Sequence, residues 1–147
     1  MRTDTVMQGY LDDPDATAAV FADDGWYRTG DLARTDDDGY LFIVDRAKDM
    51  IITGGENVYS KEVEDAISGH PDVVDVAVVG RPHPEWGETV VAHVVWREPN
   101  VVGADDLRDY LSDKLARYKI PREYVFATAL PRTPTGKIQK HLIRTAS

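Results

Sequence analysis

Residues 130–147 form a segment whose residue types suit phosphate chemistry. The segment carries four basic side chains and no acidic one, although the 147-residue chain has a net charge of −9. Within it, Thr133-Pro134-Thr135-Gly136-Lys137 matches only half of a phosphate-binding loop, because Pro131 replaces the first glycine and Ile138 replaces the magnesium-binding Ser or Thr. We therefore expect no self-contained nucleotide site. A stiff, exposed loop could still deliver the ammonium of Lys137 to a phosphate, and a solvated basic tail is the plainer alternative.

Three further residues could contribute to a ligand site. Gly54 and Gly55 follow an apolar run, where glycine lets the backbone turn sharply or lets a ligand pass close to it, and a strand bulge is the alternative. Asp31 follows Thr29-Gly30 and could accept hydrogen bonds from a ribose diol, or it could be an ordinary turn residue. The four histidines lack metal-ligand spacing and the chain has no cysteine, so we expect no metal site and no disulfide.

Charge and hydropathy argue against two other classes of function. A net charge of −9 does not suit a nucleic-acid surface, which needs basic side chains to displace counterions from phosphates. No apolar run approaches the roughly 20 residues of a membrane-spanning helix, and the polar start Met1-Arg2-Thr3-Asp4 does not resemble a signal peptide. We therefore expect a soluble cytoplasmic protein without a nucleic-acid partner or a membrane span.

The elements that would position these residues are most regular after residue 50. Apolar runs predict short strands, and apolar residues at helical spacing predict helices between them. Since the strands are few and their links mostly short, we expect an α+β fold with a small, mainly antiparallel, three-stranded sheet covered by helices. The predicted order is strand 50–53, a helix from Ser60 to His70, strands 73–79 and 89–96, helix 105–118, strand 124–126, loop 131–136 and a short helix over 138–142.

The first third of the chain has less pattern. The turn signal Asp36-Asp37-Asp38-Gly39 separates residues 26–32 from residues 40–44 and predicts a hairpin. Residues 15–21 predict a short helix, while residues 1–24 as a whole show little apolar periodicity, so we expect them to be disordered or packed on another molecule. After residue 50 we expect a buried core that includes Val76, Val78, Val91, Val94, Leu107, Leu111 and Leu115.

Taken in order, these segments resemble the C-terminal part of the adenylate-forming superfamily, which comprises acyl-CoA synthetases, nonribosomal peptide adenylation domains and beetle luciferases. Three motifs at the family's order and approximate spacing carry the resemblance. They are Gly25-Trp26-Tyr27-Arg28-Thr29-Gly30-Asp31-Leu32, then Asp45-Arg46-Ala47-Lys48-Asp49-Met50-Ile51-Ile52-Thr53-Gly54-Gly55-Glu56-Asn57-Val58-Tyr59, and Pro131-x-Thr133-x-Thr135-Gly136-Lys137-Ile138. The second and third are closer to acyl- and aryl-CoA synthetases, because peptide synthetase domains favour a different glycine segment and an Asn-Gly-Lys ending.

The resemblance implies a role for each matching residue. Asp31 would hold the ribose hydroxyls of ATP, and Arg46 would contact the ribose or the phosphates. Lys48 matches the hinge position, where the family uses aspartate or lysine. Gly54 and Gly55 would line the tunnel for the pantetheine of coenzyme A. Mg²⁺ would be held mainly by ATP and by the family's large domain.

Lys137 would bridge the substrate carboxylate and the α-phosphate during adenylation. Attack of a carboxylate on a phosphate brings two anions together, so a positioned cation that meets both lowers the barrier. The second half-reaction needs a thiol at the same carbonyl. Lys137 must therefore move away from this carbonyl, and the glycine-lined path for the thiol must take its place. Rotation about one hinge can make this exchange.

The resemblance also implies a division of the chain and a function. Residues 1–45 would be the end of the large adenylation domain with its hairpin, residues 46–49 the hinge, and residues 50–147 the lid. With the N-terminal adenylation domain of the same enzyme as partner, the chain would be part of a fatty-acid or aryl-CoA ligase that converts a carboxylic acid, ATP and CoA to acyl-CoA, AMP and pyrophosphate. Because the family's phosphate loop and acyl pocket lie upstream, the chain alone is expected to be inactive. The alternatives are a non-catalytic binding module that docks on a partner, and the lid of a peptide synthetase adenylation domain.

Overall fold

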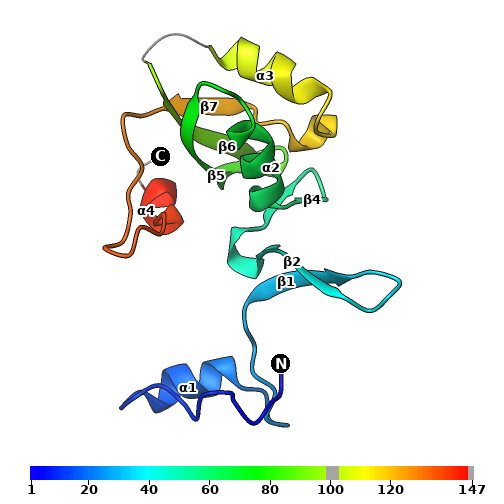
Figure 1. The fold of residues 1–147 in the computed structure, drawn as a ribbon, viewed down its shortest axis with the longest axis vertical. Helices are drawn as coiled ribbons and strands as arrows, with labels where there is room; N and C mark the ends of the chain where they lie inside the picture. Colours follow the sequence, from blue (N-terminus) through cyan, green and yellow to red (C-terminus); the bar gives the residue numbers. More distant parts are fainter. Residues whose placement is uncertain (99–102, 146–147) are drawn as a thin grey trace. The chain divides into compact units, whose positions relative to one another are not determined.

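The computed structural model describes residues 1–98 and 103–145 and shows two compact units, Met1–Ala47 and Lys48–Ser147. The first unit consists of helix α1 (Pro14–Val20) and a hairpin of strands β1 (Asp31–Thr35) and β2 (Leu41–Arg46) (Figure 1). None of the helices in the described part of the chain combines the length and the apolar character that crossing a membrane requires.

Helix α1 confirms the predicted short helix. The Asp13 carboxylate accepts a hydrogen bond from the Ala16 N–H at 2.9 Å, and Pro14 follows at a position where a missing N–H costs nothing. The helix buries none of its residues. Residues 1–24 thus contain one short helix without buried residues, and the expectation that they are disordered or packed on another molecule stays a prediction.

The predicted hairpin is present, but its first strand begins five residues later than expected. Residues 26–30 are not part of the strand because backbone groups in this stretch pair with the last residue of α1 and with the segment that follows it. The Trp26 carbonyl accepts from the Ala22 N–H and the Arg28 N–H donates to the Val20 carbonyl, both at 2.8 Å. The turn uses Gly39 at φ +85°, as the sequence indicates.

In its described residues, 48–98 and 103–145, the second unit has one sheet with three α-helices around it. The sheet has five strands rather than the predicted three, and the prediction of a mainly antiparallel α+β fold is confirmed. Strand β6 pairs with β5 along one edge, and its other edge pairs with both β3 and β7, of which only β7 is parallel. The elements are β3 (Ile51–Thr53), β4 (Glu56–Val58), α2 (Ser60–Ser68), β5 (Val73–His83), β6 (Gly87–Trp96), α3 (Ala104–Ser112), β7 (Glu123–Phe126) and α4 (Lys140–Thr145), with single turns η1 (Ala47–Asp49) and η2 (Arg117–Lys119).

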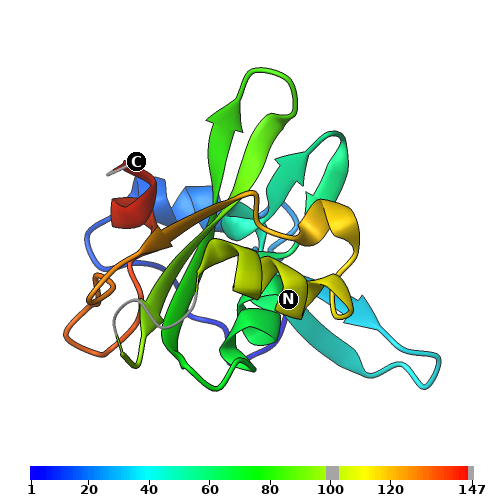
Figure 2. The same cartoon turned by 90° about the horizontal axis from the view of Figure 1, so that it is seen from above.

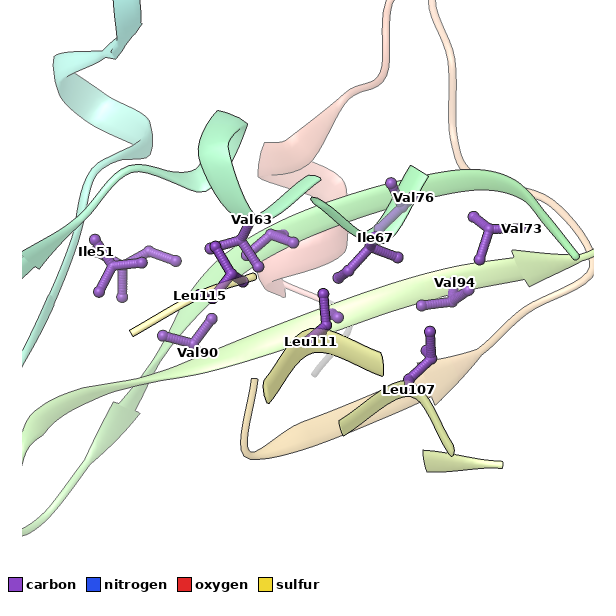
Figure 3. Packing of buried hydrophobic residues seen from close by; sticks show 13 residues of the cluster. Ile51, Val63, Ile67, Val73, Val76, Val90, Val94, Leu107, Leu111 and Leu115 are labelled. Carbon is purple, nitrogen blue, oxygen red and sulfur yellow. The ribbon is translucent and has the colours of Figure 1, made fainter. Parts of the chain in front are cut away.

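Both faces of the β5–β6 hairpin are buried. Helices α2 and α3 cover one face, and the segment that ends in α4 covers the other (Figure 2). Along β5, Val76 and Val78 therefore point into the first cluster, while Ala77 and Val79 point into the second. Figure 3 shows side chains of α2, α3 and the strands gathered in the first cluster. All seven residues predicted for the core are buried.

Helix α3 is shorter than predicted. It ends at Ser112, although apolar residues continue at helical spacing to Tyr118. Leu115 still reaches the core from the turn after the helix, whereas Tyr118 lies in η2 with 39% of its surface exposed. Helical spacing placed both Leu115 and Tyr118 on the apolar face of this helix. The structure buries Leu115 and leaves Tyr118 exposed.

Candidate functional site

The loop that carries Lys137 is a small closed turn. Arg132 and Ile138 form a bridge at its base, the Thr133 N–H donates to the Lys137 carbonyl at 2.8 Å, and the Gly136 N–H donates to the Thr133 carbonyl at 2.9 Å. Gly136 has φ +86°, and a Cβ there would meet nothing within 4 Å, so its backbone conformation is what favours glycine. The loop fixes the root of the Lys137 side chain at an exposed tip.

The three other basic residues of this segment are paired with acids from three different elements. Arg132 reaches Asp75 of β5 at 2.6 Å. Lys140 reaches Glu64 of α2 at 2.7 Å and the Ser60 hydroxyl at 2.8 Å. Arg144 reaches Asp49 of η1 at 2.9 Å.

These pairs change the interpretation of the basic segment. A solvated tail would leave all four cations in water, but three of them are tied to the body of the unit. Within residues 1–98 and 103–145, the Lys137 ammonium makes no hydrogen bond or ion pair, so its charge is available to a ligand. The carboxylate of Glu64 has a second role, because its Oε1 also accepts from the Val78 N–H at 2.8 Å.

Gly54 and Gly55 form the two-residue turn of the β3–β4 hairpin, in which Thr53 pairs with Glu56. Both have positive φ, +58° and +84°, as this kind of tight turn requires. A Cβ on either would meet nothing within 4 Å. The turn is therefore not the strand bulge considered as an alternative, and its outer side is open.

The glycine turn lies beside an aromatic and cationic stack that the sequence did not reveal. The Gly54 N–H donates to the Trp86 carbonyl at 2.9 Å. The Trp86 ring stacks on His83, with ring centroids 4.2 Å apart, and the Arg122 guanidinium lies 3.3 Å from its centroid. Because Arg122 comes 36 positions after Trp86, no local pattern could have joined them.

Asp31 and Arg46 lie together in the first unit. They are paired across the base of the β1–β2 hairpin, and Arg46 Nε lies 3.0 Å from Asp31 Oδ1. Asp31 is the first residue of β1 and not the turn residue that the sequence left open; its N–H donates to the Thr29 hydroxyl at 3.1 Å. With 58% of the Arg46 side chain exposed, the pair can exchange partners with a ligand.

Lys48 lies in η1, where the second unit begins, and its side chain is exposed. The next residue, Asp49, is buried and holds Arg144. The six residues singled out from the sequence therefore belong to four features: the Asp31–Arg46 pair of the first unit, and Lys48 in η1, the glycine turn and the Lys137 loop of the second. The described residues contain no cluster of side chains that could hold a metal ion.

Comparison with known proteins decides the family. The family described as AMP-binding enzyme C-terminal domain matches residues 62–137, about half of the chain. The chain belongs to this family. The predicted resemblance to the adenylate-forming superfamily is thereby confirmed.

Relatives of this AMP-binding C-terminal domain are parts of longer enzymes. The long-chain-fatty-acid–CoA ligase FadD13 of Mycobacterium tuberculosis is 48% identical over 144 residues, which cover 98% of this chain and 28% of that protein. Among solved structures, ATP-bound MatB from Rhodopseudomonas palustris matches with a TM-score of 0.85 and 41% identity over 95% of this chain and 28% of that one. The o-succinylbenzoate CoA synthetase MenE from Bacillus subtilis, in complex with its acyl-adenylate intermediate OSB-AMP, matches with a TM-score of 0.87 and 38% identity over the same shares.

Proposed function

We propose that this chain is the C-terminal lid of an AMP-forming acyl-CoA ligase and that Lys137 serves the adenylation step. One observation carries the proposal: among the four cations of residues 130–147, only Lys137 has no partner in the described chain, and it stands on the tip of a closed turn. A compact ammonium on a long stem can contact a carboxylate and an α-phosphate together. This contact offsets the repulsion between the two anions as they react.

Asp31 and Arg46 are proposed to serve ATP in the same step. The partly exposed Asp31 carboxylate can accept hydrogen bonds from both hydroxyls of a ribose, and the neighbouring guanidinium can hold the carboxylate in place or meet a phosphate oxygen. Mg²⁺ would be bound mainly by ATP and by the rest of the enzyme, since the described residues offer no metal cluster. This chain spans only 28% of the length of FadD13, which leaves room for that larger part.

The glycine turn is proposed to serve the second step, thioester formation. Two glycines without side chains leave open space beside β3 and β4, where the narrow pantetheine arm of CoA can pass. The nearby Arg122 guanidinium, held over the Trp86 ring, suits the phosphates at the other end of CoA. Rotation at residues 46–49, with Lys48 as the pivot, would move Lys137 away from the carbonyl of the substrate and bring the glycine turn to it. The domain division proposed from the sequence, 1–45 and 50–147 on either side of this hinge, accords with two compact units that meet between Ala47 and Lys48.

The proposal is tested by measuring the two half-reactions separately in the full-length enzyme that contains this chain. Lys137→Ala should slow acyl-adenylate formation by about 10²–10³, the usual effect of removing one transition-state donor. It should leave thioester formation from supplied acyl-adenylate nearly unchanged. Gly55→Leu should do the reverse, because its side chain would enter the open space beside the turn.

Lys61→Ala is the matched control, since Lys61 is an exposed lysine whose ammonium pairs with Asp65 on the same helix. It should leave both steps unchanged. Equal loss of both steps in Lys137→Ala would contradict the two-step assignment. Normal rates of both would contradict the proposed role of Lys137 in adenylation.

A further inference from the structure

The Lys137 loop is held at two points by arginines. Before the loop, Arg132 bridges the body and the loop tip: its guanidinium pairs with Asp75 of β5 at 2.6 Å and also donates to the Gly136 carbonyl. After the loop, Arg144 at the end of α4 donates to Asp49 of η1 at 2.9 Å. Arg132 thus fixes the tip of the loop, and Arg144 fixes the segment that leaves it.

The second contact joins two regions that are 95 residues apart in the sequence. Asp49 directly follows Lys48, the residue proposed as the pivot of the hinge, and its side chain is only 12% exposed. Helix α4 begins three residues after Lys137 and is anchored by Ile143 in the second core cluster. A short helix with both an apolar anchor and an ion pair therefore connects the base of the lysine loop to the hinge segment.

These arginines are not the main support of the C-terminal segment. The Lys140–Glu64 pair is the most buried of the three, with each side chain 15% exposed. Arg132 and Arg144 are 43% and 30% exposed, so water can replace much of what they contribute to stability. Their geometry, at the tip of the loop and at the hinge, points to placement of the Lys137 ammonium.

We infer that Arg132 and Arg144 are positioning residues, which make the Lys137 loop a rigid extension of the hinge segment. The inference rests on the proposed role of Lys137 in adenylation. Rotation at Lys48 then delivers the ammonium to one place, and no separate ordering of the loop is needed at each turnover. A displacement of about 1 Å from the productive position is enough to slow a reaction about a hundredfold.

The catalytic test uses Arg132→Gln and Arg144→Gln in the full-length enzyme. Each should lower kcat for acyl-adenylate formation about tenfold, part of the loss that a 1 Å displacement can cause. The KM for ATP and the thioester step should change little, because each guanidinium is already paired with an acid of the same unit. Arg132→Lys and Arg144→Lys retain the ion pair and should recover part of the rate, while Lys61→Gln, which breaks an exposed pair within α2, should have no effect.

A second measurement does not depend on activity. Amide hydrogen exchange on the 147-residue chain should be faster at Gly136 and Lys137 in Arg132→Gln, and faster at Leu142 in Arg144→Gln. The Val78 amide, which donates to Glu64, should be unchanged in both. Unchanged exchange at the loop and at α4 would overturn the inference.

The two measurements separate the two ideas. Faster exchange together with slower adenylation supports the inference. Faster exchange with full adenylation overturns the positioning role while leaving Lys137 in place. If Lys137→Ala itself adenylates normally, the proposed function fails, and the arginines are then supports of a loop with another purpose.

Discussion

The two units of the chain differ in how much of their apolar surface they bury. Every buried hydrophobic residue of the described chain lies between Ile51 and Ile143, in the second unit. In the first unit Asp45 is the only buried residue, and eight large hydrophobic side chains are exposed. Four of these are consecutive, at Tyr40, Leu41, Phe42 and Ile43.

The difference teaches which unit can move as one body. The second unit has two apolar clusters on a five-stranded sheet and can keep its shape through a rotation. A two-stranded hairpin and a helix without buried residues have marginal stability alone. The first unit therefore needs another surface to cover it, and we propose the large domain of the same enzyme for that role.

The largest expected effect comes from truncating the core of the second unit. Leu111→Ala should lower the free energy of unfolding by about 2–5 kcal/mol, because the leucine is fully buried in the first cluster. Leu41→Ala is the matched control: its side chain is 65% exposed, so the change should stay within about 0.5 kcal/mol. Urea unfolding of the 147-residue chain measures the free energy of unfolding of both variants. Equal losses in the two variants would contradict the difference in burial between the units.

A smaller effect is expected at two glycines with nearly the same φ. Gly136 in the lysine loop has φ +86° and Gly39 in the first unit has φ +85°, and neither has an atom near the place of a Cβ. Alanine costs about 1–2 kcal/mol in this conformation. Gly136→Ala should lower the stability of the second unit by about that amount, whereas Gly39→Ala should leave its unfolding midpoint unchanged. A shift of that midpoint by Gly39→Ala would mean that the two units unfold together.

The smallest effect concerns pH. Burial lowers the pKa of His93 below the ordinary value of 6.5, and the nearby Arg81 lowers it further. The folded state therefore binds this proton less readily than the unfolded state does. The free energy of unfolding is then at its full value above pH 6.5, and it decreases as pH falls below 6.5 toward the lower pKa of the folded state. The second unit should therefore lose a little stability between pH 7 and pH 5, and His93→Gln should reduce this loss.

The first unit provides an internal comparison for that measurement, because all four histidines of the chain lie in the second unit. Thermal unfolding at a series of pH values, followed separately for the two units, is the measurement. A pH dependence between 7 and 5 that is unchanged in His93→Gln would show that another group is responsible.

The sequence predicted the parts of the fold that repeat a pattern. The apolar runs of β5 and β6 and the helical spacing of Leu107, Leu111 and Leu115 predicted the core, and the seven positions named for it are buried. Strand β4 was missed because Glu56-Asn57-Val58 is short and mostly polar, and only pairing with β3 makes it a strand. The extent of the sheet depends on such pairings between distant segments.

For the candidate site, too, local motifs could be predicted and contacts between distant segments could not. Motifs named Asp31, Arg46, Gly54 and Lys137, because a family motif is local in sequence. The contacts that surround them are not local: Arg144 meets Asp49 across 95 residues, and no spacing rule could pair them. Only the three-dimensional structure distinguishes the three paired cations of residues 130–147 from Lys137, which has no partner in the described chain.

The carboxylates that hold the basic segment also decide how the second unit meets other molecules. Strand β5 is an edge of the sheet, and an edge with free N–H groups can recruit a strand from another chain. Here the Val78 N–H is already bonded to Glu64 and the Val76 N–H to Asp75, at 2.8 and 3.1 Å. Losing either carboxylate would expose a donor on this edge, so the unit would become prone to self-association as well as losing its hold on Lys140 or Arg132.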